Sequence, residues 1–270
     1  MRIFNKLLEQ QWAQEKYLCV GLDPKLEDAK RYFQDYPVTE MLFFLTRAIV
    51  NSTKDIACAY KPNFAFYIGH GSCGLRALSL TIDHIRFVTP QVPIILDAKI
   101  GDIGATNEGY VRMLDALHAD AITVHPYLGK ESLQPLLRRK DKGIFVLCRT
   151  SNEGAGEFQD IVEHSSCLTQ FQRVANNVSE TWNEHGNCGL VAGATYPEEL
   201  GTIRSITSIL PLLIPGVGTQ GGNLKESVLN AKHRFLINVS SGLLKNGLEG
   251  VLDIARQYSD DINAYRLQIA

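Results

Sequence analysis

The sequence predicts a (β/α)8 TIM barrel with its active site at the carboxyl ends of the strands. Eight short apolar runs recur along 270 residues, segments with helical periodicity separate them, and unusual polar residues follow the runs. Strands that are apolar on both faces and alternate with helices call for a parallel sheet, because parallel neighbours need a crossover connection. Eight such units in about 250 residues fit a closed barrel better than an open doubly wound sheet.

The expected elements alternate along the chain. The eight expected strands are Leu18–Leu22, Ala57–Lys61, Pro93–Lys99, Ala121–His125, Ile144–Arg149, Gly189–Ala194, Leu212–Val217 and Phe235–Val239. Helical periodicity is found over Met41–Thr53, Thr106–Leu117, Leu168–Asn183, Glu198–Ser205 and Leu224–Ala231. No linker or compositional break divides the chain, so we expect a single domain over residues 1–270.

Composition and charge are those of a soluble globular protein. Hydrophobic residues make up 45% of the chain and charged residues 21%, with a formal net charge of −2. The one basic cluster, Arg138-Arg139-Lys140, is too short for a nucleic-acid track. Six cysteines without a C-x-x-C pair favour reduced core thiols. Without a signal peptide or a long apolar span, we expect a cytoplasmic protein with no membrane or nucleic-acid partner.

Polar residues gather where the expected strands end. This rim is where barrel enzymes assemble their active sites. The residues placed there are Asp23, Lys61, Asn63, Asp97, Lys99, His125, Thr150 and Ser151.

The third of these strand ends carries the densest charge. Asp97-Ala98-Lys99 closes an apolar run, and Gly101 and Asp102 follow. Residues i and i+2 of a strand share a face, so Asp97 and Lys99 are expected on one side, while Gly101 lets the backbone turn. One interpretation is a structural ion pair at the rim of the sheet; the other is a catalytic lysine that neighbouring carboxylates keep protonated.

Two glycine-containing loops complete the pattern. Residues 214–223, Ile-Pro-Gly-Val-Gly-Thr-Gln-Gly-Gly-Asn, leave the seventh strand and lead into a helix, a suitable cradle for phosphate unless they form a plain glycine turn. Residues 150–157 follow the fifth strand and form either a lid or an ordinary connection. Their short polar side chains could hydrogen-bond a planar heterocycle.

Together these motifs resemble the orotidine 5′-phosphate decarboxylase family, in particular its longer bacterial subgroup, from about Val20 to Ser241. The resemblance rests on Val20-Gly21-Leu22-Asp23-Pro24, Lys61-Pro62-Asn63, residues 97–106 (Asp-Ala-Lys-Ile-Gly-Asp-Ile-Gly-Ala-Thr), His125-Pro126-Tyr127-Leu128-Gly129, Arg149-Thr150-Ser151-Asn152 and residues 215–222 (Pro-Gly-Val-Gly-Thr-Gln-Gly-Gly). The D-x-K-x-x-D element alone is shared with a wider superfamily of phosphosugar decarboxylases and aldolases.

The resemblance implies a cofactor-free conversion of orotidine 5′-monophosphate to uridine 5′-monophosphate, without a metal. Lys61, Asp97, Lys99 and Asp102 would form an alternating charge network. Lys99 would protonate C6 of the pyrimidine, and Asp97 would lie against the departing carboxylate. Asp102 and Thr106 would reach into the active site of a partner subunit, so the resemblance implies a homodimer.

The same resemblance implies the substrate-binding residues. Asp23 and Lys61 would hold the ribose, Ser151 the pyrimidine edge, and Gln220 with Gly221 the phosphate. Asn63, Pro215 and Ser241 complete the set of expected contacts.

One position departs from the family pattern. Ser241 stands where the family carries a phosphate-binding arginine, and a neutral hydroxyl binds phosphate less strongly than a charged guanidinium. We expect weaker phosphate affinity or compensation by another cation such as Lys245. Two alternatives stay open: a metal-dependent phosphosugar decarboxylase or aldolase of the superfamily, and a non-catalytic barrel that binds a nucleotide phosphate.

Overall fold

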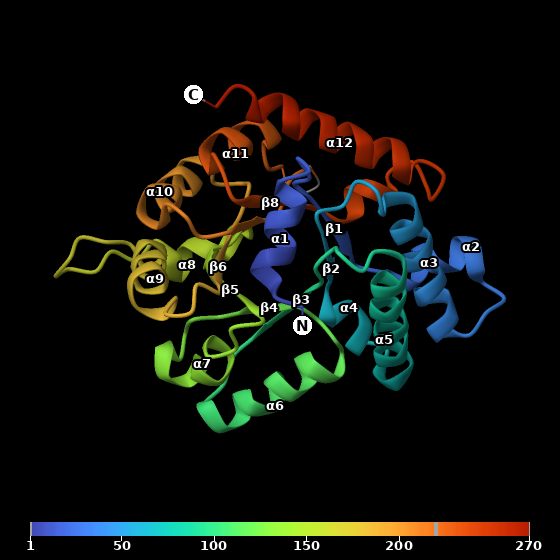
Figure 1. The fold of residues 1–270 in the computed structure, drawn as a ribbon, viewed down its shortest axis with the longest axis horizontal. Helices are drawn as coiled ribbons and strands as arrows, with labels where there is room; N and C mark the ends of the chain where they lie inside the picture. The colour runs from blue at the N-terminus through green and yellow to red at the C-terminus, as the bar shows by residue number, and fades with distance from the viewer. Residues whose placement is uncertain (1, 219–220, 270) are drawn as a thin grey trace.

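Eight parallel strands form one barrel in the computed structural model, which describes residues 2–218 and 221–269 (Figure 1). The strands are β1 (Leu18–Leu22), β2 (Ala59–Pro62), β3 (Ile95–Ile100), β4 (Ala121–Val124), β5 (Gly143–Arg149), β6 (Cys188–Ala192), β7 (Leu212–Ile214) and β8 (Phe235–Val239). They follow the order β2-β1-β8-β7-β6-β5-β4-β3. Isolated bridges from Tyr60 to Ile94 and from Asn63 to Asp97 join the two end strands and close the barrel.

Helices surround these strands in Figure 1. The longer ones are α1 (Phe4–Trp12), α2 (Leu26–Phe33), α3 (Val38–Thr53), α5 (Gly71–Val88), α6 (Gly104–Ala116), α7 (Gly129–Leu137), α9 (Gln170–Asn177), α10 (Pro197–Thr207), α11 (Leu224–Ala231) and α12 (Val251–Arg266). Two shorter ones are α4 (Phe64–Ile68) and α8 (Gly156–Gln159). The predicted fold class is therefore confirmed.

Some predicted boundaries are wrong. The helix expected over Leu168–Asn183 begins at Gln170, where Thr169 and Gln172 form a capping box, and its last part, Val178–Trp182, is a π-helix. Strand β7 ends at Ile214 instead of Val217, because Pro215 offers no N–H and Gly216 adopts a φ of +97°. Helices α1, α2, α5, α7 and α12 were not predicted.

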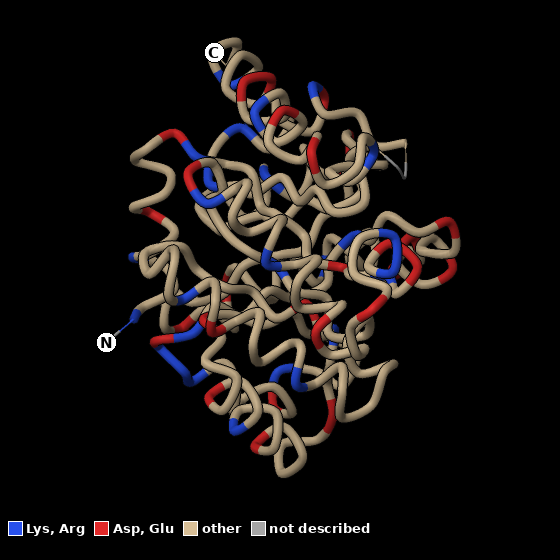
Figure 2. The backbone as a smooth tube through the Cα atoms, turned by 90° about the vertical axis from the view of Figure 1, so that its right-hand side faces the viewer, with Lys and Arg blue, Asp and Glu red and all other residues tan. Residues whose placement is uncertain are grey.

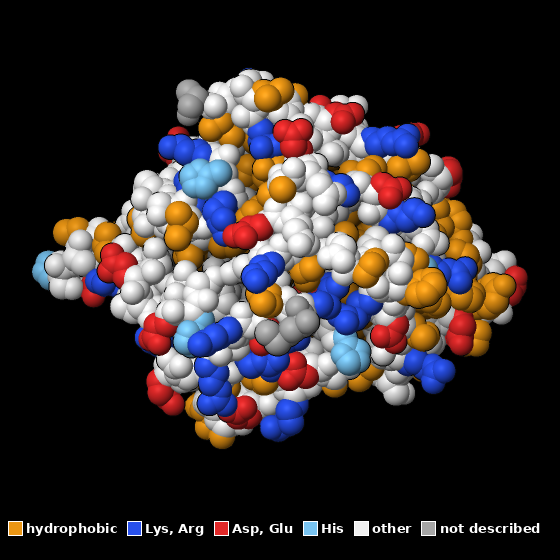
Figure 3. Space-filling model, viewed as in Figure 1, with side chains coloured by type: hydrophobic (Ala, Val, Ile, Leu, Met, Phe, Trp, Pro, Cys, Tyr) orange, Lys and Arg blue, Asp and Glu red, His pale blue; other side chains and the backbone are white. Residues whose placement is uncertain are grey.

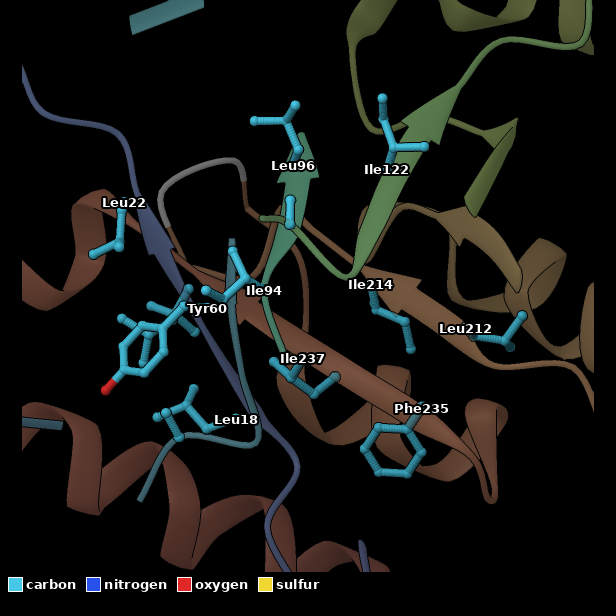
Figure 4. Close-up of a cluster of buried hydrophobic side chains, with 14 of the residues drawn as sticks. Leu18, Leu22, Tyr60, Ile94, Leu96, Ile122, Leu212, Ile214, Phe235 and Ile237 are labelled. Atoms are coloured by element: carbon cyan, nitrogen blue, oxygen red, sulfur yellow. The ribbon is translucent and has the colours of Figure 1, made fainter. Parts of the chain in front are cut away.

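Alternate strand residues separate two apolar layers. Leu18, Leu22, Ile94, Leu96 and Ile122 are all fully buried and belong to the larger apolar cluster that the strands share with the helices (Figure 4). The intervening residues form a second cluster inside the barrel: Cys19, Ala59, Ile95, Ala121, Phe145, Val191, Leu213 and Leu236, together with Cys58 and with Phe4 and Leu8 of α1. This arrangement follows from the two-residue period of a strand.

Helix α1 covers the amino-terminal end of the barrel. The Phe4 ring packs edge-on against Phe145 with 5.6 Å between ring centroids. Gly143 leaves room for this ring, because a Cβ there would lie 2.3 Å from Phe4 Cδ1. Arg2 pairs with Asp120 beside it, which fixes the chain where it enters the helix.

Toward the carboxyl end, the inward positions change from apolar to polar. Two residues beyond members of the inner cluster, four of the strands present Lys61, Asp97, Thr123 and Asn238 to a cavity, while Leu147 and Pro215 keep two of these positions apolar. The apolar layer thus forms the floor of a polar chamber.

The surface mixes both charge signs. Lys and Arg alternate with Asp and Glu along the chain and on the face seen in Figure 3 (Figures 2 and 3). Within the described residues, no helix is long and apolar enough to cross a membrane. All six cysteines are free, but Cys73 and Cys167 are exposed, so the expectation of six core thiols is wrong for these two.

We predict that Phe4→Ala destabilises the fold, because Phe4 is 2% exposed and fills the amino end of the barrel. The expected loss in the free energy of unfolding is about 3–5 kcal/mol, measured by urea denaturation. Phe87→Ala is the matched control, since Phe87 is 85% exposed and should change stability little. Equal losses in the two variants would contradict this role for Phe4.

Candidate active site

A cavity of about 490 Å³ opens at the carboxyl ends of the strands. Such a volume suits a nucleotide-sized ligand. Its lining residues come from β1 to β8 and their loops: Asp23, Lys61, Asn63, Asp97, Lys99, Thr123, Leu147, Thr150, Ser151, Asn152, Gln159, Val191, Leu213, Pro215, Gly216, Val217, Asn238, Ser240 and Ser241.

The Asp97 carboxylate is the centre of the charged network. Its Oδ2 accepts a hydrogen bond of 2.7 Å from Lys61 Nζ. Its Oδ1 accepts bonds of 2.6 Å from Lys99 Nζ and 2.9 Å from Thr123 Oγ1. Asp97 therefore holds two ammonium groups in fixed positions within one chain.

The protonation states follow from burial and charge. Burial opposes ionisation of Asp97, but the ammonium groups of Lys61 and Lys99 outweigh it and hold the pKa of this carboxyl well below its usual range. Burial also favours the neutral form of Lys61, which is 2% exposed, yet Asp97 and Asp23 raise its pKa above the ordinary value. The site therefore keeps the Asp97 carboxylate and the Lys61 ammonium charged at neutral pH.

The backbone at Lys99 departs from regular strand geometry, and this departure brings the side chain of Lys99 to Asp97. The Lys99 backbone has a φ of +49°, in the left-handed region, and the pairing of β3 with β4 shifts register between Leu96 and Ile100. Such a conformation costs a non-glycine residue roughly 1 kcal/mol or more. The Lys99 N–H donates to Thr123 Oγ1 at 2.9 Å, which stabilises the turn. The Lys99 side chain is 48% exposed, so its ammonium faces the cavity from the rim.

Two acceptors in the cavity wall are buried without a partner in the described structure. They are Asp23 Oδ1, just after β1, and Asn238 Oδ1, on the neighbouring strand β8. Buried acceptors of this kind need a donor, which a ligand hydroxyl can supply. Gly21 makes the arrangement possible, because a Cβ there would lie 1.8 Å from Ser240 Oγ and 3.2 Å from Asn238 Oδ1.

Most of the predicted site residues line this one cavity. Those brought together are Asp23, Lys61, Asn63, Asp97, Lys99, Ser151, Pro215 and Ser241. Asp102, Thr106 and Gly221 lie outside its lining, so the predicted four-residue charge network is incomplete within one chain. Gln220 falls outside the described residues.

The Asp102 loop is tied to its own helices instead. Asp102 Oδ1 accepts from the Ile103 N–H at 2.6 Å, and the buried Asn107 side chain bonds the Asp102 backbone on both sides. Asn107 also donates to the Ser132 carbonyl at 2.6 Å. These contacts hold Asp102 at the rim, next to the exposed Thr106.

Several lining residues were not predicted. Thr123, Asn152, Gln159, Asn238 and Ser240 all face the cavity. Asn238 carries a usable signal, since it is a polar residue within the buried strand β8. Gln159 carries none, because it lies ten residues after Arg149, beyond the expected strand and outside every motif of the resemblance.

His125 has a structural role. The Tyr127 N–H donates to Nδ1 at 3.3 Å, so Nε2 carries the proton and donates to the Gly101 carbonyl at 3.1 Å. A side chain at Gly101 would collide with this ring. The histidine thus joins the loops that follow β3 and β4.

Comparison with known proteins agrees with this geometry. The family model described as "Orotidine 5'-phosphate decarboxylase / HUMPS family" matches residues 16–249. The chain belongs to this family. An orotidine 5′-phosphate decarboxylase of Thermomicrobium roseum is 41% identical, covering 99% of this chain and 97% of its own length. That of Herpetosiphon aurantiacus is 45% identical over 84% of this chain and 83% of its own.

Solved structures of family members share the barrel. The OMP decarboxylase of Leishmania donovani superposes with a TM-score of 0.85 at 36% identity, covering 98% of this chain and 99% of its own. The UMP synthase of the same organism gives a TM-score of 0.87 at 37% identity. The match covers 98% of this chain but 57% of that longer one.

We predict that Asp97→Asn lowers the free energy of unfolding by about 3–5 kcal/mol at pH 7, because it leaves the buried Lys61 ammonium without its counter-charge. The pKa of Asp97 is depressed in the fold, so its stabilisation is present above the unfolded pKa of about 4 and is lost as the pH falls below it. The gap between wild type and variant should therefore narrow below about pH 4 in urea denaturation. The exposed Asp35→Asn is the control, and a gap independent of pH would refute the assignment.

Proposed function

We propose that this chain is a single-domain, cytoplasmic orotidine 5′-phosphate decarboxylase of de novo pyrimidine biosynthesis, which converts orotidine 5′-monophosphate to uridine 5′-monophosphate and carbon dioxide. The observation that carries the proposal is the Asp97 carboxylate held between Lys61 and Lys99 in a nucleotide-sized cavity. Membership of the family supports the same reaction.

The chemistry of the step explains the charges. Loss of carbon dioxide from C6 leaves a carbanion in the ring plane, where no π system accepts the electron pair. A nearby cation stabilises that charge and a proton completes the product. Lys99 supplies both, since its ammonium is half-exposed in the cavity and Asp97 fixes its position.

Asp97 contributes in a second way when substrate binds. Its charge lies where the substrate carboxylate is bound, and two unit charges about 4 Å apart repel by roughly 4 kcal/mol at an effective dielectric constant near 20. Enzymes lower barriers by roughly 8–23 kcal/mol, so this repulsion is a minor part. Stabilisation of the carbanion and binding of the phosphate must supply most of the effect.

The other walls bind the rest of the nucleotide. Asp23 and Asn238 offer buried acceptors for ribose hydroxyls, and Ser151 lies on the wall proposed for the pyrimidine. The phosphate is assigned to the end formed by Pro215, Gly216 and Ser241, with Gln220 and Gly221 in the same loop. Lys245, one turn beyond Ser241, is outside the described lining of this cavity.

We assign Asp102 and Thr106 to the active site of a partner subunit in a homodimer. Both lie at the rim but outside the cavity of their own chain. Large apolar side chains are exposed on the adjoining loops: Ile103 is 58% exposed, Tyr127 86% and Leu128 46%. A patch of this kind beside charged site residues is typical of a subunit interface.

We predict that the purified protein decarboxylates orotidine 5′-monophosphate in the presence of EDTA, measured as loss of substrate absorbance. Lys99→Ala should lower kcat by about 10²–10⁴-fold or more, because it removes the proton donor. Lys6→Ala, an exposed change on α1, is the control and should retain full activity. A wild type without turnover would exclude this function. Activity that EDTA abolishes would favour the metal-dependent enzyme of the superfamily, and binding of nucleotide without turnover would favour the non-catalytic barrel.

We also predict that two inactive variants restore activity when mixed. A mixed dimer of Lys99→Ala and Asp102→Ala has one site with both native residues, so random mixing should recover about a quarter of the wild-type activity. Native mass spectrometry with one subunit isotopically labelled shows whether mixed dimers form. Mixed dimers without activity would argue against a shared site.

A further inference from the structure

Gln159 at the end of α8 contacts the wall that the residues directly after β5 form. It lines the cavity together with Thr150, Ser151 and Asn152, which follow β5 directly. Strand β6 separates β5 from β7 and β8, which lead into the proposed phosphate end, so this wall is distinct from that end.

The orientation of the Gln159 amide is fixed by obligate donors. The Thr150 N–H points at Oε1 from 2.9 Å, and the Arg149 guanidinium points at the same atom from 3.3 Å. Because both groups can only donate, the atom that faces them must be the amide oxygen. The nitrogen Nε2 therefore faces Thr150 Oγ1, at 2.8 Å.

The same donor-to-acceptor direction continues from Gln159 through Thr150 to Asn152. Thr150 Oγ1 accepts from Gln159 Nε2 and donates its own proton to Asn152 Oδ1, at 2.7 Å. Both side-chain amide oxygens are then engaged inside the wall. One N–H of Gln159 and the Nδ2 group of Asn152 make no hydrogen bond within the described residues.

Arg149 stabilises this orientation of the Gln159 amide. It is 3% exposed, its guanidinium stacks over the Tyr196 ring at 3.7 Å from the centroid, and it pairs with Asp160 at 3.2 Å. Gly193 lets the neighbouring segment approach closely, because a Cβ there would lie 2.8 Å from the backbone nitrogen of Ser151. The wall is thus a firmly held donor surface.

We propose that the Gln159–Thr150–Asn152 chain is a specificity device that presents N–H donors to the base and selects a carbonyl oxygen over an amino group at C4 of the pyrimidine. This inference rests on the proposed function and names residues that set its base preference. A donor surface accepts a carbonyl but leaves an amino group facing other donors, which costs affinity.

The test measures dissociation constants of uridine 5′-monophosphate and cytidine 5′-monophosphate by calorimetry. Wild type should prefer the uridine nucleotide. Gln159→Glu replaces the donating nitrogen by an acceptor at nearly the same size, and should lower that preference by about tenfold or more. Thr150→Val removes the relay oxygen but keeps the backbone bond to Gln159, and should lower the preference in the same direction.

Controls separate a change in specificity from a change in folding. Gln159→Met should reduce the uridine preference while the affinity for ribose 5-phosphate, which has no base, stays unchanged. Gln10→Glu, on the exposed face of α1, should behave as wild type. A preference that persists in folded Gln159→Glu and Gln159→Met, or its absence in wild type, overturns the proposal. Because binding is measured without turnover, a failure of the decarboxylase assignment is detected separately by the activity assay.

Discussion

The ion pair between Lys61 and Asp97 connects the architecture of this protein to its chemistry. It bridges β2 and β3, the two strands that isolated bridges rather than a continuous ladder join. The Asn63 bridge to Asp97 closes the barrel at the same level. Asp97 thus belongs both to the seam of the barrel and to the centre of the cavity. Removing one partner leaves a buried charge uncompensated, so the site cannot lose either residue alone without weakening the fold.

The barrel supplies the polarity gradient that the site needs. Along each strand the inward residues follow a two-residue period, and the floor is apolar while the next level is polar. Burial in this floor raises the pKa of the Cys19 thiol to about 12, so the thiol stays protonated beneath the charged groups. The low polarity below Lys61 and Asp97 strengthens their attraction. Inside the barrel, the charged residues that the structure describes lie only at the level of the cavity, because the inner apolar cluster below it contains no charged side chain.

The alternation of apolar runs and helices was sufficient to predict the fold, and strand-end position was sufficient to predict Asp23, Lys61, Asp97 and Lys99. The contact of Lys99 with Asp97 was predicted, but not the left-handed turn that produces it, because a register shift depends on Thr123 of the next strand. Gln159 was missed since its role arises from the return of a loop onto β5. Asp102 was predicted to reach into a partner subunit, and it lies outside the cavity of its own chain.

Helix α1 affects the route by which ligands enter and leave the cavity. Phe4 packs against Phe145, and the inner apolar cluster fills the amino end of the barrel among the described residues. In the proposed reaction, carbon dioxide therefore leaves through the same mouth by which the nucleotide enters. The nucleotide and the carbon dioxide therefore pass the same lining residues, among them Gln159 at the end of α8.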